Sequence, residues 1–376
     1  MRVLAALSGG VDSAVAAARA VDAGHDVTAV HMALSANRSE SRCSSRGCCT
    51  VEDASDAART AAKLGIPFYV WDMAEEFTDT VVNDFLSEYR SGRTPNPCVR
   101  CNEFVKFREL LDRGRSLGFD AVCTGHYATL VQGPEGPELH RGSDPLKDQS
   151  YVLAVMGREN LNRVLFPLGG AATKAEVRAE AQARGFTVSQ KPDSYDICFI
   201  PDGDTFGFLK RNLDSNRGNI VTPEGEVLGQ HDGYFGFTVG QRKGLHIDRP
   251  APDGRPRYVL ETRPQTNEVV VGPVELLTVN RISATRPVWL VPDSDEVLAG
   301  AEGVAVGGLQ VQVRAHGRPV DALIERKGET IIAHIVGEER SGIPGMRGIA
   351  PGQSMVIYRD TRVIAEATIS GAWKEK

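Results

Sequence analysis

Two separate segments carry the cysteines best placed for covalent chemistry. The first segment, residues 94–102, reads TPNPCVRCN. Its prolines predict a stiff loop that opens onto a helix, so we expect Cys101 at or near a helix N-terminus. There the positive end of the helix dipole stabilises a thiolate and lowers the pKa of the thiol. Lys106 and Arg108 would add positive charge nearby. This segment therefore predicts a nucleophilic thiol.

The second segment, residues 191–200, reads KPDSYDICFI and contains Cys198. Its position beside apolar residues is equally typical of a cysteine buried in a strand of the core. The residues alone therefore leave two roles open for Cys198, a reactive thiol or a core side chain.

A glycine-rich loop follows the first apolar run of the chain. Two adjacent glycines let the backbone approach a phosphate closely, and the next helix offers N–H groups and a positive dipole end. The chain has no Walker-type Gly-Lys-Ser/Thr motif. The alternative is an ordinary strand-to-helix turn with Asp12 or Ser13 as the N-cap. The position between a strand and a helix favours a nucleotide site made of Leu7, Ser8, Gly9, Gly10, Val11, Asp12 and Ser13.

The remaining cysteines show weaker signals. Cys43, Cys48 and Cys49 lie among serines before a predicted helix, and neighbours such as Cys48 and Cys49 are badly placed to bridge each other. We interpret this group as structural or incidental. Cys123 lies in a predicted strand and is expected in the core. Seven cysteines, an odd number, indicate catalytic, redox or metal-binding roles in a reducing compartment.

Alternating strands and helices must position these residues. Apolar periodicity predicts strands over 3–7, 27–32, 67–71 and 120–124 and helices over 11–23, 53–64, 75–89 and 101–117. This order predicts an α/β fold, a doubly wound parallel sheet with helices on both faces.

The pattern changes after about residue 205. Residues 219–229 predict a hairpin that turns at 223–225, and short strands with frequent Gly/Pro turns continue to the end. We therefore expect a catalytic domain over 1–205 and two small β-rich, barrel-like domains over 206–273 and 274–376.

Composition narrows the class of protein. Hydrophobic residues make up 41% of the 376 residues and charged residues 24%, which is typical of an ordered chain. The net charge of −6 argues against nucleic-acid binding through global charge, but not against local basic patches. No secretory signal and no apolar run of the ~18 residues that span a bilayer are apparent, so we expect a cytoplasmic protein without a membrane partner.

Two basic regions could contact nucleic acid, or could be ordinary solvated surfaces. The first comprises Arg242, Lys243, Arg249, Arg255 and Arg257. The second lies on a predicted helical stretch after Tyr151 and comprises Arg158, Arg163, Lys174, Arg178 and Arg184. Residues 147–150, just before that stretch, could simply cap its helix.

The motifs, taken in order, resemble one family. Residues 8–13 resemble the PP-loop of enzymes that cleave ATP between the α and β phosphates. Together with 94–102, Lys106-Phe107, 124–127, 147–151, 193–199 and the GQRKGL block at 240–245, they look like the bacterial tRNA-specific 2-thiouridylase family. The resemblance covers essentially the whole chain.

This resemblance implies a reaction and its site. ATP with Mg²⁺ would adenylate the carbon-2 carbonyl oxygen of the wobble uridine in tRNA for Lys, Glu and Gln. A sulfur-carrier protein would load a persulfide on Cys198, and Cys101 would release the sulfur and form a disulfide with Cys198. Met32 and Gly125 would hold the adenosine. Contacts with tRNA would come from His126, Lys147, Asp148, Gln149, Arg314 and Gln353. We expect a monomer or a weak dimer.

One departure from the family concerns Cys98. Many members carry an acidic residue at this position, so an acid role there does not transfer to this chain. Cys98, Cys101 and Cys198 could instead ligate an iron–sulfur cluster with one open iron site, whereas zinc is less natural with three thiolates. Alternatively, Cys98 only fills space.

Two competing interpretations remain. A PP-loop enzyme acting on a small molecule, such as an amidating synthetase, would need no cysteine pair. A non-enzymatic regulator that binds ATP or a cluster and RNA would form neither AMP nor pyrophosphate.

Overall fold

The computed structural model describes residues 1–34, 51–192, 197–200, 202–247, 251, 253–300, 303–336 and 345–375. The predictions for Cys43, Cys48, Cys49 and Arg249 fall outside these residues. Over the described residues, no helix is long and apolar enough to cross a bilayer.

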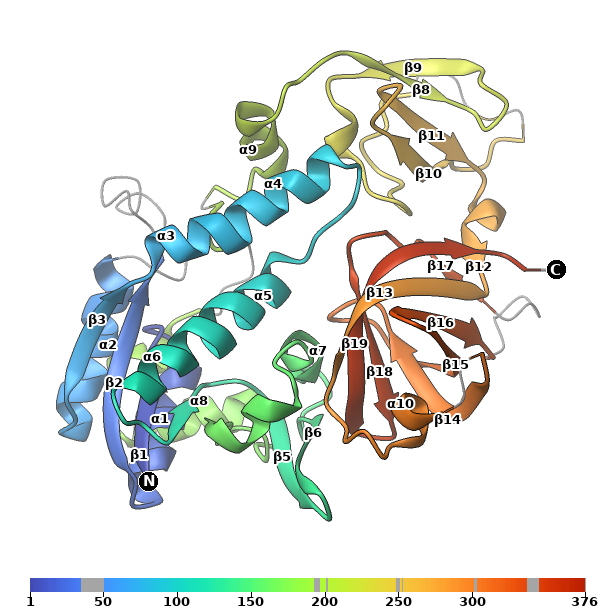
Figure 1. Ribbon diagram of the computed structural model, residues 1–376. Helices are drawn as coiled ribbons and strands as arrows, with labels where there is room; N and C mark the ends of the chain where they lie inside the picture. The colour runs from blue at the N-terminus through green and yellow to red at the C-terminus, as the bar shows by residue number, and fades with distance from the viewer. Residues whose placement is uncertain are drawn as a thin grey trace.

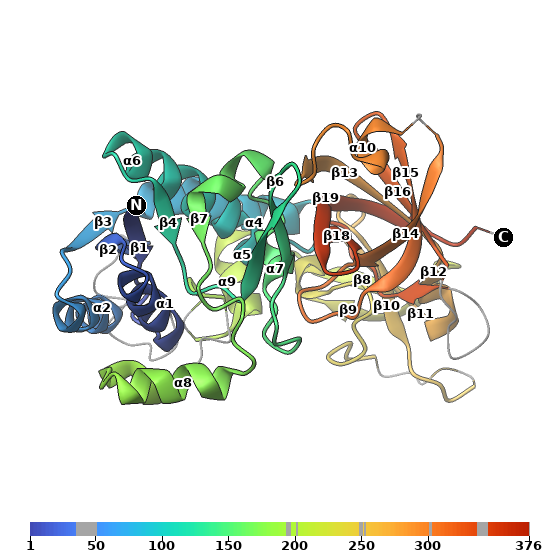
Figure 2. The ribbon, with the colours of Figure 1, turned by 90° about the horizontal axis from the view of Figure 1, so that it is seen from below.

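A five-stranded parallel sheet forms the centre of the N-terminal region. Its strand order is β3-β2-β1-β4-β7. The helices α1, α2 and α8 cover one face and α6 lies on the other (Figure 2). The predicted α/β fold is confirmed. The elements are β1 (Arg2–Ala6), α1 (Val11–Asp22), β2 (Asp26–Ala33), α2 (Val51–Leu64), β3 (Phe68–Asp72), α6 (Leu110–Ser116), β4 (Ala121–Cys123), β7 (Val164–Leu165) and α8 (Lys174–Ala183).

Two long helices cross the region between this sheet and the C-terminal part (Figure 1). The first runs without a break through α3 (Ala74–Phe77), a π-helical stretch Thr78–Val82 and α4 (Asn83–Arg90). The second runs through α5 (Pro97–Arg100), a π-helical stretch Cys101–Glu109 and α6. We call this second helix, 97–116, the cysteine helix.

The cysteine helix begins four residues earlier than predicted. The side-chain oxygen of Asn96 accepts hydrogen bonds from the backbone N–H groups of Cys98 (3.1 Å) and Val99 (3.4 Å), and proline occupies the first helical position. Both features favour a helix start. Cys98 therefore occupies the first turn and Cys101 lies just after it, near the N-terminus as predicted but not at the first helical residue.

The stretch after Tyr151 is broken rather than a single helix. It comprises α7 (Ser150–Leu153), a 3₁₀ turn Arg158–Arg163, the strand β7, α8, a second 3₁₀ turn Thr187–Gln190 and α9 (Thr205–Asn212). Gly157, with φ of 75°, separates α7 from the first 3₁₀ turn. The expected helical surface with five basic residues is therefore wrong, because Arg158 and Arg163 lie on a different element from Lys174 and Arg178.

The central region is a four-stranded sheet in the order β10-β11-β8-β9. Its strands are β8 (Gly218–Val221), β9 (Val227–His231), β10 (Tyr258–Arg263) and β11 (Glu268–Gly272), with a 3₁₀ turn Tyr234–Gly236. The antiparallel pair β8–β9 confirms the predicted hairpin. Gly225 takes the positive φ of 91° that its turn requires.

The C-terminal region contains a closed barrel of six strands, because β13 pairs with both β16 and β19. The strands are β13 (Arg281–Trp289), β14 (Ala305–Gln312), β15 (Val320–Lys327), β16 (Thr330–Ile335), β18 (Ser354–Arg359) and β19 (Arg362–Trp373). A 3₁₀ turn Val274–Leu277, α10 (Glu296–Ala299) and a ribbon of β12 (Thr278–Val279) with β17 (Met346–Arg347) complete it.

A hairpin from the N-terminal region joins the barrel sheet. It consists of β5 (Ala128–Gly133) and β6 (Gly136–Arg141), and β6 pairs with β19 at His140 and Arg362. The sequence analysis did not predict this hairpin. It ties the barrel to the region that carries the nucleotide loop and the cysteines.

Candidate active site

The nucleotide loop, residues 8–13, joins β1 to α1 at the carboxyl edge of the parallel sheet. β1 lies between β2 and β4, so the loop sits where the strand order reverses, the usual ligand position in such sheets. The Ser13 hydroxyl donates to the Gly10 carbonyl (3.0 Å) and accepts from the Ser8 N–H (3.2 Å). Gly10 is the N-cap and no side chain caps the helix. The alternative with Asp12 or Ser13 as N-cap is therefore wrong.

Two glycines shape this loop into a cradle made of backbone. Gly9 has φ of 79°, and a Cβ on it would lie 2.3 Å from the Asp53 carbonyl oxygen. A Cβ on Gly125, just after β4, would lie 2.6 Å from the Ser13 nitrogen. Because only glycine fits at either position, backbone can approach a phosphate without a side chain between. This geometry suits ATP.

Leu7 and Met32 flank the cradle. Leu7 is buried, and its N–H donates to the Val30 carbonyl (2.8 Å) on β2. The His31 Nδ1 lies 2.8 Å from the Leu7 carbonyl oxygen. Met32 is half-buried near the carboxyl end of β2. The predicted nucleotide residues therefore gather at one edge of the sheet.

Lys191 holds the loop from the segment that leads to Cys198. Its ammonium donates to the Gly9 carbonyl (2.9 Å) and to the carboxylates of Asp53 (2.6 Å) and Asp56 (2.7 Å). Burial opposes the charge, but these hydrogen bonds raise the pKa of Lys191, so it stays protonated. No local pattern singles out Lys191 and Asp53, because their partners lie far away along the chain.

Asp12 is held by two side chains on the other side of the loop. The Tyr127 hydroxyl donates to its Oδ1 (2.7 Å), and the Lys174 ammonium bonds its Oδ2. Both carboxylate oxygens of Asp12 are therefore engaged by donors of this chain, and a Mg²⁺ that accompanies ATP stays a prediction. Lys174, considered above as part of a basic surface, thus contacts the nucleotide loop.

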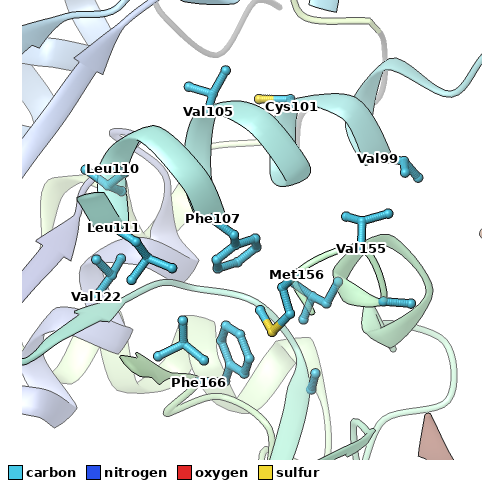
Figure 3. Close-up of a cluster of buried hydrophobic side chains, with 14 of the residues drawn as sticks. Val99, Cys101, Val105, Phe107, Leu110, Leu111, Val122, Val155, Met156 and Phe166 are labelled. Carbon is cyan, nitrogen blue, oxygen red and sulfur yellow. The ribbon is translucent and has the colours of Figure 1, made fainter. Parts of the chain in front are cut away.

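Cys101 lies on the cysteine helix and is 9% exposed. Figure 3 shows Cys101 and Val105 on one side of the helix and Phe107 on the opposite side. Cys101 belongs to a buried apolar cluster that also contains Ala6, the last residue of β1, and Cys198 packs against the same cluster. One core therefore connects both cysteines to the strand that leads into the nucleotide loop.

Cys198 is partly exposed and lies in a turn, so its interpretation as a buried strand cysteine is wrong. Its apolar neighbours anchor the segment instead. The Phe199 ring packs edge-to-face against Phe85 (5.2 Å between centroids) and Phe77 (5.8 Å), and Ile200 is 2% exposed. These contacts hold the Cys198 turn close to the helix 74–90.

The other described cysteines differ in environment. Cys98 is exposed on the first turn of the cysteine helix. Cys123 is 1% exposed on β4, and burial raises the pKa of its thiol to about 12, so its predicted core role is confirmed. The described part of the chain contains no group of three side chains placed to hold a metal ion. Cys98, Cys101 and Cys198 as placed do not fit a cluster, and we derive no step through one.

Comparison with known proteins gives the family. A model of the tRNA methyl transferase HUP domain matches residues 1–202, one of the tRNA methyl transferase PRC-barrel domain matches 207–273, and one of the aminomethyltransferase beta-barrel domain matches 279–369. The chain is 59% identical to the tRNA-specific 2-thiouridylase MnmA of Beutenbergia cavernae, covering 100% of this chain and 96% of that protein. It is 57% identical to the protein of the same name from Micrococcus luteus, covering 99% and 97%.

The chain belongs to the tRNA-specific 2-thiouridylase family. The resemblance drawn from the ordered motifs is thereby confirmed.

The residues that this family resemblance assigns to tRNA contact are spread over several environments. His126 is buried between the rings of Phe107 and Phe166, and its Nδ1 lies 2.7 Å from the Thr124 hydroxyl. Burial and nearby Lys106 lower the pKa of His126, so its imidazole is neutral. In this structure His126 therefore supports the end of β4, and its tRNA contact stays a prediction.

Asp148 and Gln149 stabilise their own loop. The Asp148 carboxylate accepts from the N–H groups of Gly142 and Ser150 (both 3.0 Å) and from Arg141 (3.1 Å). The Gln149 side chain accepts from the Tyr127 N–H (2.9 Å). The N-cap of α7 is Gln149, whose side chain makes no capping hydrogen bond, while Asp148 binds the Ser150 N–H at the start of the helix. Lys147 is half-buried beside them.

Arg314 and Gln353 lie where regions of the chain meet. The Arg314 guanidinium donates to the Gly348 carbonyl, beside Gly240 of the central region. The Gln353 amide donates to the carbonyls of Thr94 (2.7 Å) and Pro95 (3.3 Å), which precede the cysteine helix. No local pattern signals these contacts, because the partners lie far apart in the chain.

Proposed function

We propose that this chain replaces oxygen by sulfur at carbon 2 of the wobble uridine in tRNA of the Lys, Glu and Gln type, at the expense of ATP. One observation carries the proposal. A single buried cluster contains the end of β1, which leads into the nucleotide loop, and Cys101, and Cys198 packs against it. A site for activating a carbonyl and two thiols for sulfur transfer thus share one domain.

The first step activates the uridine. The carbon-2 carbonyl is a poor electrophile because its oxygen is a poor leaving group. Attack of that oxygen on the α-phosphate of ATP releases pyrophosphate and leaves AMP bonded to the oxygen. The Gly9–Gly10 backbone and the hydroxyls of Ser8 and Ser13 would bind phosphates, and Asp12 would bind Mg²⁺. Met32 and Gly125 would contact the adenosine.

The second step transfers sulfur. The terminal sulfur of a persulfide on Cys198 attacks carbon 2, and AMP leaves with the oxygen. The Cys101 thiolate then attacks Sγ of Cys198 and breaks the sulfur–sulfur bond, whose electron pair stays on the sulfur bound to uridine. The products are 2-thiouridine and a Cys101–Cys198 disulfide, which an external thiol must reduce before the next cycle.

The tRNA must present its base by flipping it out of the anticodon stack. The exposed Arg242 and Lys243 of the central region are candidates for phosphate contacts. We further propose that a sulfur-carrier protein supplies the persulfide, and that the chain is divided into domains over 1–205, 206–273 and 274–376. The cytoplasmic location and the monomer or weak dimer stay predictions.

The decisive experiment combines the purified chain with ATP, a persulfide donor and unmodified tRNA, followed by mass spectrometry of the nucleosides. We expect 2-thiouridine together with AMP and pyrophosphate. The Cys198→Ser variant should form no 2-thiouridine yet bind ATP with unchanged affinity. Absence of 2-thiouridine with the unaltered chain would contradict the proposed function.

The same assay separates the competing functions. The domain models are described as methyl transferases, and a methylated uridine would support that reaction instead. An amidating synthetase would consume ATP without tRNA, and a regulator would bind ATP without forming AMP. The two reactive cysteine segments favour sulfur transfer, since none of these alternatives needs a thiol pair.

An iron–sulfur cluster calls for its own measurement. We expect protein purified without oxygen to carry less than stoichiometric iron, because the described cysteines do not assemble into a ligand set. Iron and sulfide near cluster stoichiometry, lost in Cys98→Ser, would contradict this expectation.

A further inference from the structure

The barrel contacts the loop that precedes the cysteine helix. The turn 351–353, just before β18, meets residues 94–95. The Thr94 N–H donates to the Pro351 carbonyl (2.8 Å). In return, the Gln353 amide nitrogen donates to the carbonyl oxygens of Thr94 (2.7 Å) and Pro95 (3.3 Å). The turn therefore binds the loop through one N–H donor and two carbonyl acceptors of the loop.

The turn is shaped for this contact. Gly352 has φ of 93°, and a Cβ there would lie 3.0 Å from the Arg93 Cβ and 3.1 Å from the Thr94 nitrogen. A bulkier residue in place of Gly352 would push the barrel away from the loop. The Gly352 N–H and the Gln353 carbonyl both bond Ile369 on β19, so the barrel sheet fixes the turn.

A second contact lies on the cysteine helix itself. Arg100, between Cys98 and Cys101, donates to the Thr368 hydroxyl on β19 (3.3 Å). The guanidinium also pairs with Glu103 (2.6 Å) and Asp84 (3.5 Å) of the two long helices. Its side chain is 13% exposed. This contact places a barrel strand against the turn of helix that carries Cys98 and Cys101.

We propose that Gln353 is a positioning residue that fixes the cysteine helix for sulfur transfer. The proposal rests on the proposed function. Gln353 holds Thr94 and Pro95, the next residue Asn96 caps the helix, and the capped turn leads to Cys101. Transfer between Cys198 and Cys101 needs the two sulfurs in line, and an error of about 1 Å in such a geometry can cost up to about 100-fold in rate.

The hydrogen bonds of the Gln353 amide distinguish the positioning role from a contact with tRNA. A glutamine amide has two N–H donors, and two carbonyls of the loop accept from the Gln353 nitrogen. A phosphate needs donors, so a contact with tRNA phosphate would compete with the loop. The placement of Gln353 thus favours positioning of the thiols over recognition of the substrate.

The test measures sulfur transfer and ATP use separately. The Gln353→Leu variant keeps the volume of the side chain and removes both donors. In a single turnover at saturating tRNA, with ATP and the persulfide-loaded chain, we expect AMP release within about twofold of the unaltered chain, while the 2-thiouridine released per AMP at early times falls about tenfold. Gln310→Leu is the matched control, because Gln310 bonds Asp321 on the barrel away from the loop (2.8 Å).

Thr368→Val is a second variant, in case Gln353→Leu is poorly folded. It removes the hydroxyl that Arg100 contacts and preserves the shape of the side chain. We expect a smaller fall in 2-thiouridine per AMP in the same direction. An unchanged ratio in both variants overturns the proposal, whether or not tRNA affinity changes. If the unaltered chain forms no 2-thiouridine, the proposed function itself fails, which is a separate outcome.

Discussion

The nucleotide loop and the cysteine helix lie in the same region of the molecule, but they are held in different ways. The loop is built from a strand, a turn and a helix that are continuous in sequence, with Gly125 packed against the helix start. The cysteine helix begins at a loop whose carbonyls are bound by Gln353, 259 and 258 positions away. Under the proposed function, ATP activation would depend on the N-terminal sheet and the segments packed on its loop, whereas sulfur transfer would depend on how the barrel is docked.

This difference has a functional consequence. A change in the barrel should alter the position of the thiols while the nucleotide loop keeps its shape. A change in the loop should remove ATP binding while the thiols stay in place. The variants below test whether ATP binding and sulfur transfer can be disrupted separately in this way.

The largest effect is expected at Cys101. Cys101→Ser removes the thiol that breaks the sulfur–sulfur bond, so multiple-turnover 2-thiouridine formation should fall by about 1,000-fold or more, while AMP release should stop after about one equivalent per chain. Cys98→Ser, on the exposed first turn of the same helix, is the matched control and should stay within about threefold of the unaltered chain. Quantitative nucleoside mass spectrometry measures both. Equal losses in the two variants would support a shared ligand set and contradict the mechanism.

Gly9→Ala should disrupt the nucleotide loop and leave the cysteine helix in place. Its Cβ would lie 2.3 Å from the Asp53 carbonyl oxygen at a φ of 79°, so the loop must distort. We expect ATP affinity to weaken by about 100-fold, corresponding to roughly 3 kcal/mol. Isothermal titration with ATP gives the value. Gly170→Ala, where a Cβ meets nothing within 4 Å, should bind ATP normally. Normal ATP binding by Gly9→Ala would show that the cradle does not hold the nucleotide.

Lys191 connects the nucleotide loop with the segment that contains Cys198. Its ammonium binds the loop, and the segment begins at this residue. In Lys191→Met the carboxylates of Asp53 and Asp56 lose their shared cation, and the Asp53 side chain is only 7% exposed. We expect the free energy of unfolding to fall by about 2 kcal/mol, measured by urea denaturation. Lys63→Met, at an exposed position on α2, is the control. An unaltered denaturation midpoint in Lys191→Met would argue against a structural tie.

Glu366 lies on β19 near Arg100, where the barrel meets the cysteine helix. Its titration should make the stability of the folded protein depend on pH. Glu366 is 2% exposed, its Oε1 has no hydrogen-bond partner within the described part of the chain, and burial raises its pKa from 4.5 to about 7. The folded protein therefore holds the proton more tightly than the unfolded chain. Its contribution to stability is complete below about pH 4.5 and is lost as the pH rises through 7, a change of about 3 kcal/mol.

Glu366→Gln should remove this dependence on pH. We expect the variant to unfold at higher urea than the unaltered chain at pH 8 and at similar urea at pH 4.5. Glu329→Gln, exposed in the turn between β15 and β16, should change neither value. If Glu366→Gln follows the unaltered chain at both pH values, Glu366 does not titrate in this range.

The local pattern of the sequence predicted the N-terminal fold because strands and helices there alternate with clear apolar periodicity. It also predicted a glycine loop between a strand and a helix, where the structure has a cradle of backbone. The binding of a nucleotide by these residues stays a prediction. It placed the start of the cysteine helix too late, because the Asn96 cap and Pro97 were interpreted as a loop. It missed the β5–β6 hairpin, whose pairing with β19 depends on a strand more than two hundred residues later.

Short-range patterns were enough to predict a phosphate-binding type of loop and to point to two cysteine segments, because those signals lie in neighbouring residues. What holds these residues in place emerged from the fold. Lys191 reaches back to Gly9, and Gln353 and Thr368 of the barrel hold the cysteine helix. Such contacts leave no local signal, since each partner is an ordinary polar residue until the fold brings the two together.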